Sequence, residues 1–112
     1  MGQCRGLCSR VIRGDVWLAQ VGRKRRPVLV LTRSAVMDVR TIVTVAEITT
    51  TIRGLSVEVA VDHSSIGLDR ACVINCDGLH TVSQSLLTEF VGAVDEVTLQ
   101  RVCAAVAAAL GC

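Results

Sequence analysis

Aromatic side chains are nearly absent from this 112-residue sequence, which contains one tryptophan, one phenylalanine and no tyrosine. Proteins that hold single-stranded nucleic acid by base stacking rely on exposed aromatic rings. The composition therefore excludes stacking as the main mode of binding. The formal net charge is only +2. Any surface that attracts anions must therefore come from local clustering of cations, because the field of the whole chain is weak.

Long apolar runs are also missing, and none approaches the roughly 18 residues that a membrane-spanning helix needs. The first ten residues carry charges but no apolar segment of the kind found in a signal peptide. We therefore expect a cytoplasmic protein with no membrane partner. Residues 1–10 are expected to form a loose N-terminal arm, and residues 11–112 a single domain.

Six cysteines are present, but none of them shows the two-residue spacing of a zinc knuckle. Cys72 and Cys76 lie four residues apart on an expected strand, so their side chains should face the same side. Cys103 falls on the apolar side of an expected helix. In the absence of a secretion signal we expect structural thiols, with an incidental metal site or disulfide as the alternative. No metal and no cofactor is expected.

Most of the chain reads as short strands, because apolar residues alternate or run together over segments of five to eleven residues. The continuous apolar run in the second strand predicts that both of its faces are covered. In the fourth strand, valines alternate with Glu58 and Asp62, which should face away from the core. Strands are expected at 11–21, 28–32, 41–49, 57–62 and 71–76, followed by a turn at 77–78 and a short strand at 79–82.

The apolar period changes to that of a helix towards the end of the sequence. Ser83 can cap a short helical stretch that reaches Phe90. Asp95 can cap a final helix, which Gly111 would end. Several short strands followed by one helix predict a small β-barrel or twisted antiparallel sheet closed by a terminal helix.

One stretch stands out chemically, because four cations at 23–26 run into Pro27 and then into an apolar strand. The residue before a proline is driven into extended geometry. The side chain of Arg26 should therefore point in a restricted direction at the start of the second strand. A basic run of this length is also typical of an ordinary solvated loop, so the residues alone leave both interpretations open.

Several short segments occur in an order that resembles the MazF/PemK family of toxins. They are RGDVW at 13–17, RPVLVL at 26–31, AEIT at 46–49, GLDR at 67–70, VIN at 73–75 and FVG at 90–92. The resemblance covers about residues 11–110. It implies a homodimer of SH3-like barrels of the CcdB/PemK type, cutting single-stranded messenger, transfer or ribosomal RNA without a metal. It also implies a cognate MazE-like antitoxin whose extended tail covers the RNA groove.

The resemblance places the family's catalytic arginine on Arg26 and its catalytic threonine on Thr49. The loop between the first two strands lacks the acid that many members carry, and His80 stands where an arginine is usual. Glu47 or His80 could transfer protons, although residues of these types are more often structural: Glu47 as a surface acid in a salt bridge, and His80 as a hydrogen-bonded loop histidine. The RNA-binding set that we predict is Arg23, Lys24, Arg25, Arg26, Thr50 and Arg53.

Two other interpretations remain open at this point. A CcdB-type toxin would share the fold but act on DNA gyrase by protein contact through the end of its last helix. The C-terminal Leu110-Gly111-Cys112 lacks the Trp-Gly-Ile of that class, and the Arg26/Thr49 pair would have no purpose there. The other alternative is an inactive barrel that binds nucleic acid but has lost its catalytic base.

Overall fold

The computed structural model describes residues 11–33 and 42–111. The predicted arm at 1–10, the first residue of the strand predicted at 41–49, and Cys112 lie outside these residues. Within these two ranges, six strands, two short 3₁₀ helices (η) and one α-helix follow in chain order. They are β1 (Asp15–Val21), β2 (Lys24–Val30), β3 (Ile42–Thr49), β4 (Glu58–Val61), η1 (His63–Ile66), β5 (Cys72–Ser83), η2 (Gln84–Leu86), β6 (Leu87–Ala93) and α3 (Glu96–Leu110).

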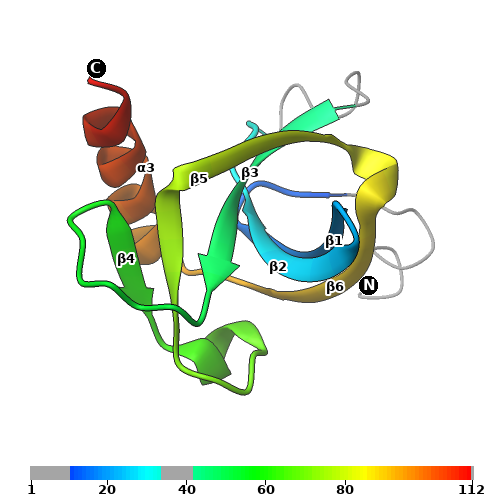
Figure 1. Cartoon of the computed structure of the whole chain (residues 1–112), viewed down its shortest axis with the longest axis horizontal. Helices are drawn as coiled ribbons and strands as arrows, with labels where there is room; N and C mark the ends of the chain where they lie inside the picture. Colours follow the sequence, from blue (N-terminus) through cyan, green and yellow to red (C-terminus); the bar gives the residue numbers. More distant parts are fainter. Residues whose placement is uncertain (1–10, 34–41, 112) are drawn as a thin grey trace.

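All strand pairs in the described residues are antiparallel, and they form one sheet in the order β4-β5-β3-β2-β1-β6. The sheet is strongly bent, and α3 lies along one side of it next to β4 and β5 (Figure 1). The predicted class, mainly β with a terminal helix, is confirmed. The predicted closure into a barrel is not observed, because the described ladders leave β4 and β6 as separate edges. None of the described helices combines the length and apolarity needed to cross a membrane.

Two apolar clusters lie on opposite faces of the sheet, and β2 contributes to both. Leu29 packs with Ile74 and with Val102 of α3 on one face. Val28 and Val30 pack on the other face. The three β2 residues are fully buried, which confirms that both faces of this strand are covered. Successive side chains of a strand point to opposite faces, so a continuous apolar run was the pattern to expect.

Several predicted boundaries of the first two strands are wrong. β1 begins at Asp15 instead of residue 11, because a turn precedes it in which Gly14 adopts a positive φ of 92°. The turn between β1 and β2 is confined to Gly22 and Arg23. The cations from Lys24 onward therefore belong to β2 rather than to a connecting loop.

The expected turn at Asp77-Gly78 does not separate two strands. β5 runs through it as one element, and residues 76–78 are left out of the ladder with β3, which resumes at Leu79. Such an irregularity bends a strand without ending it. The Asp-Gly pair, which predicted a turn, therefore lies in a bulge of a continuous strand.

The helical stretch predicted from Ser83 to Phe90 is also wrong beyond its first turn. Ser83 does act as an N-cap, accepting a hydrogen bond from the Ser85 backbone N–H. The helix η2 is however only three residues long, and the chain continues as β6, which pairs with β1. Pairing with the open edge of β1 satisfies the backbone hydrogen-bonding groups of this segment. The spacing of its apolar residues in the sequence could not predict that distant partner. For α3, the predicted caps Asp95 and Gly111 are confirmed.

Gly92 packs against the backbone of Ile66, and Gly67 packs against the backbone of Val91. The two glycines belong to separate segments of the family pattern. A Cβ on Gly92 of β6 would come within 2.5 Å of the Ile66 carbonyl oxygen. A Cβ on Gly67, which follows η1 with φ of +83°, would come equally close to the carbonyl oxygen of Val91. Only glycine allows this approach. The contact fixes the segment after β4 against β6.

Replacing Gly92 by alanine should therefore destabilise the fold by about 2–3 kcal/mol, since the new methyl group meets backbone that cannot move aside. Urea denaturation at a fixed protein concentration measures the change. The control is Gly22→Ala, where a Cβ meets no atom within 4 Å and only the positive φ costs about 1 kcal/mol. Equal midpoints for Gly92→Ala and the wild type would contradict the close contact.

Candidate functional site

The predicted catalytic residues of β2 and β3 share one face of the sheet. Val28 pairs with Glu47 in the β2–β3 ladder. The same register, extended by two residues, sets Arg26 opposite Thr49. Because residues two apart on a strand share a face, Arg26, Glu47 and Thr49 continue the face on which Val28 packs. The site is thus an extension of a buried apolar surface.

Glu47 and His80 form a direct contact across β3 and β5. The Glu47 Oε2 atom lies 3.1 Å from the His80 Nε2 atom. His80 pairs with Val45, two residues before Glu47, so the two side chains are diagonal neighbours on the same face. Both are partly buried. An ionised carboxylate can only accept hydrogen bonds, so opposite an ionised Glu47 the donor of this contact is the His80 Nε2 atom.

The hydroxyl group of Thr49 is oriented by the turn that follows β3. Its Oγ1 atom accepts a hydrogen bond of 3.0 Å from the backbone N–H of Thr51. A hydroxyl has one proton to donate as well as lone pairs to accept. With an acceptor role already filled, the Thr49 proton is left to donate to a ligand on the face shared with Arg26.

The four cations at 23–26 do not act together, because β2 separates them. Lys24 and Arg26 alternate with Arg25 and therefore lie on the same face as Glu47. Arg25 lies on the other face, where its Nη2 atom is 3.1 Å from Thr88 Oγ1 and 3.4 Å from Glu89 Oε1. Within the part of the chain that the structure describes, the Arg26 side chain makes no hydrogen bond or ion pair.

The remaining predicted RNA-binding residues, Thr50 and Arg53, lie in the loop between β3 and β4. Both are exposed. The Arg53 Nε atom lies 3.8 Å from Glu58 Oε2. Glu58 was expected to point to solvent, but only 3% of its side chain is exposed. Sequence reasoning missed its role because the alternation of β4 identifies its face and not the loop that covers it.

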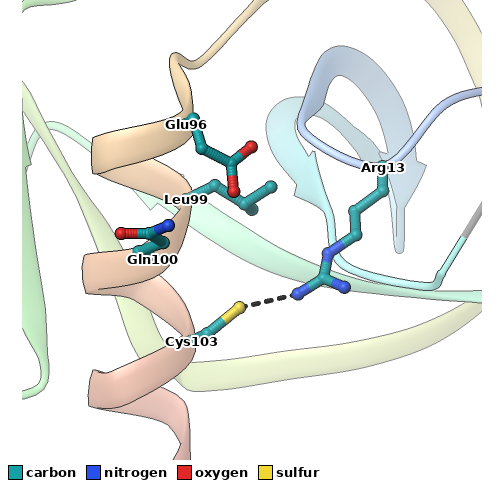
Figure 2. A pocket seen from close by; sticks show the side chains of 5 residues that line it. All are labelled: Arg13, Glu96, Leu99, Gln100 and Cys103. Atoms are coloured by element: carbon teal, nitrogen blue, oxygen red, sulfur yellow. Dashed lines mark hydrogen bonds between the residues drawn. The ribbon is translucent and has the colours of Figure 1, made fainter.

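A cavity of about 420 Å³ lies on the opposite side of the sheet from Arg26. Figure 2 shows Arg13 reaching from the segment before β1 towards residues on successive turns of α3. The Arg13 Nη2 atom donates a hydrogen bond of 2.8 Å to Cys103 Sγ. This contact ties the chain before β1 to α3. The cavity is lined by Arg13, Glu96, Leu99, Gln100 and Cys103.

The three cysteines that the structure describes carry free thiols. Cys72 and Cys76 lie in the apolar cluster beneath α3, as predicted from their spacing. Burial raises the pKa of the Cys72 thiol. Burial and the nearby Cys103 raise the pKa of the Cys76 thiol to about 11. Cys4, Cys8 and Cys112 lie outside the described residues.

Comparison with known proteins identifies the class of this fold and site. A family model described as PemK-like, MazF-like toxin of type II toxin-antitoxin system matches residues 12–110. The chain therefore belongs to the PemK/MazF family of toxins.

Relatives and solved structures agree with this assignment. The Probable endoribonuclease MazF5 of Mycobacterium tuberculosis is 36% identical over 103 residues, which cover 89% of this chain and 93% of the relative. The structure of Mycobacterium tuberculosis toxin MazF-mt6 is 37% identical, with a TM-score of 0.81 over 87% of this chain and 96% of that chain.

A second similar structure is described as an endoribonuclease in complex with its cognate antitoxin from a mycobacterial species. It is 28% identical to this chain, with a TM-score of 0.81 over 90% of this chain and 95% of that one. These findings support a MazF-type toxin and not the CcdB alternative.

The burial of the cysteines predicts their reactivity. At pH 8 only about one Cys76 thiol in a thousand is ionised, because its pKa is about 11, and the thiolate is the reactive form. Iodoacetamide should therefore modify the partly exposed Cys103 while sparing Cys72 and Cys76 until the protein unfolds. Peptide mapping by mass spectrometry, with and without urea, measures this difference. Rapid labelling of Cys76 in the folded protein would contradict the packing beneath α3.

Proposed function

We propose that this toxin is an endoribonuclease that cuts single-stranded RNA at a short sequence without a metal ion, and so arrests growth. The observation that carries the proposal is the shared face of β2, β3 and β5. It combines Arg26, a cation that pairs with no other side chain in the described ranges, with the Thr49 hydroxyl and the Glu47–His80 pair. Relatives of this chain are named endoribonuclease or probable endoribonuclease. These names support RNA cleavage as the reaction.

The reaction that fits these groups is attack of the RNA's own 2′-hydroxyl on the adjacent phosphorus. A bond forms from the 2′ oxygen to phosphorus while the bond to the 5′ oxygen breaks. The 2′ oxygen loses a proton and the departing 5′ oxygen gains one. The products are a 2′,3′-cyclic phosphate and a 5′-hydroxyl. Extra negative charge develops on the non-bridging oxygens in the transition state.

Arg26 is assigned to stabilise that developing charge. A guanidinium is always protonated and meets phosphate oxygens with two parallel hydrogen bonds. It accelerates the reaction to the extent that it binds the transition state better than the ground-state phosphate. Thr49 is assigned to donate a hydrogen bond to a non-bridging oxygen.

The Glu47–His80 pair is assigned to proton transfer. Glu47 holds the His80 ring through Nε2, which defines its orientation and leaves Nδ1 to exchange a proton. A positioned acid or base of this kind contributes typically about 10²–10⁴ in rate. The absence of an acid from the β1–β2 turn supports this assignment, because the proton acceptor must come from elsewhere in the site.

Binding of the RNA backbone is assigned to the cations around the site. Arg23 and Lys24 are exposed at the start of β2, and Arg53 is exposed in the β3–β4 loop beside Thr50. Each cation that neutralises a phosphate releases counterions, so binding should weaken as salt increases. Arg25 is left out of this set because it lies on the other face, next to Glu89.

The proposed partners are a second copy of the chain and an antitoxin. We propose that the toxin acts as a homodimer in the cytoplasm and that a cognate antitoxin inhibits it. An acidic, extended antitoxin tail over Lys24 and Arg26 would neutralise the charge that RNA needs. The similar structure of an endoribonuclease in complex with its cognate antitoxin supports inhibition by an antitoxin.

Arg26→Ala should lower the rate of RNA cleavage by about 10²–10³, because a charge-stabilising donor is lost from the transition state. The matched control is Arg25→Ala, which removes the same charge from the next residue of the same strand but on the other face. Cleavage of a long single-stranded RNA in EDTA, with primer extension to map the cuts, measures both variants.

Discrete cuts by wild type and Arg25→Ala, and their loss in Arg26→Ala, are the expected result. Circular dichroism and the oligomeric state should be unchanged in both variants. An Arg26→Ala protein that cuts as fast as the wild type, or a folded wild type that leaves the RNA intact in EDTA, would contradict the proposed reaction.

His80→Ala and Glu47→Gln should each lower kcat by about 10²–10⁴, and the double variant should lose little more than the worse single variant. The reason is that the two side chains act as one proton-transfer unit, and such effects are not additive. Single-turnover cleavage assays of the three variants measure the coupling. Independent losses that multiply in the double variant would contradict a joint role.

A further inference from the structure

The β3–β4 loop is held by a single buried carboxylate. Glu58 Oε1 accepts hydrogen bonds from the backbone N–H groups of Arg53 at 3.0 Å, Gly54 at 2.9 Å and Leu55 at 3.3 Å. Its second oxygen, Oε2, lies 3.3 Å from the Arg53 N–H and 3.8 Å from Arg53 Nε. The Glu58 backbone N–H in turn donates to the Leu55 carbonyl at 3.0 Å.

Three successive N–H groups that converge on one anion form a nest, in which the carboxylate replaces an external anion. Gly54 has a positive φ of 74°, which glycine adopts readily and which turns its N–H towards Glu58. Hydrogen bonds to an ionised acceptor are about twice as strong as neutral ones. Glu58 therefore fixes the loop through its backbone, whereas the loop's own side chains at 50–55 are exposed.

The clamp lies on the same face as the candidate site. Glu58 pairs with Asn75 in the β4–β5 ladder, and Asn75 pairs with Glu47 in the β3–β5 ladder. Directly paired residues share a face, so one row of side chains leads from the Glu47–His80 pair to the clamp. The loop that Glu58 holds begins immediately after Thr49 and presents the exposed residues 50–55.

We propose that Glu58 is a positioning residue that holds the β3–β4 loop in the shape that binds the RNA nucleotides next to the cleaved phosphate. This proposal rests on the proposed function. Glu58 contacts the loop backbone and Arg53, and no hydrogen bond joins it to Glu47 or His80 in the described structure. Its loss should therefore weaken substrate binding more than the chemical step.

Two substitutions at this position test the clamp, with one control elsewhere. Glu58→Gln keeps the shape and one acceptor oxygen but removes the charge. Glu58→Ala removes all of the contacts. Glu89→Gln makes the same chemical and charge change on the opposite face, next to Arg25. Circular dichroism and urea denaturation establish that each variant is folded before it is assayed.

The kinetic test is the separation of KM from kcat on a short single-stranded RNA that contains a mapped cleavage site. Hydrogen bonds to charged groups are worth enough to predict an increase in KM of roughly 10-fold for Glu58→Gln. For Glu58→Ala the increase should be nearer 100-fold. The kcat value should change by less than about 3-fold, and Glu89→Gln should match the wild type. A fall in kcat at unchanged KM, or no change in either value, would overturn the positioning role.

Hydrogen exchange in the free protein tests the clamp without RNA. The amides of Arg53, Gly54 and Leu55 should be protected in the wild type and in Glu89→Gln. In Glu58→Gln and Glu58→Ala their exchange should approach the rate of an open loop. Unprotected amides in the wild type would overturn the clamp while leaving the proposed reaction intact. Protected amides in a wild type that cuts no RNA would show that the proposed function, and with it the positioning role, has failed.

Discussion

The alternation of side chains along β2 is the constraint on which the candidate site depends. β2 is paired on both sides, and its residues Val28, Leu29 and Val30 are fully buried against two different apolar clusters. A slip of one residue would exchange the two faces. Arg25 would then face Glu47, and Arg26 would face Glu89. The packing of the apolar half of the strand thus determines which cations of the basic run lie on the face of Glu47 and Thr49.

The bulge in β5 lies between the two residues of that strand that share the face of Glu47. On one side of it Asn75 pairs with Glu47, and on the other side His80 pairs with Val45. Gly78 lies in the unpaired segment, where a Cβ would come within 3.0 Å of Asn75 Nδ2 and 3.4 Å of Glu47 Cβ. Because Asn75 also pairs with Glu58, the row of side chains continues into β4 on this face.

The features predictable from the sequence are those set by short-range chemistry. Local residue type predicts the caps at Ser83, Asp95 and Gly111. Local apolar period predicts the buried second strand and the shared face of Cys72 and Cys76. What could not be predicted depends on partners distant in the chain. The strand character of β6 requires the edge of β1, and the burial of Glu58 requires a loop to cover it. The assignment of Arg26 and Thr49 to a catalytic role came from the family resemblance, because composition leaves a basic run equally consistent with a solvated loop.

The two carboxylates on the candidate face would at first be expected to oppose RNA binding, since they sit among its cations. Each is instead engaged by groups of the protein: Glu47 by His80, and Glu58 by the nest of loop N–H groups and Arg53. In the described residues neither Lys24 nor Arg26 forms an ion pair with these carboxylates. The cations of this face therefore stay clustered and available to an anion, although the net charge of the chain is only +2. Under the proposed function, Glu47 would serve the chemical step and Glu58 would shape the loop that binds substrate, and both would leave Arg26 to the phosphate.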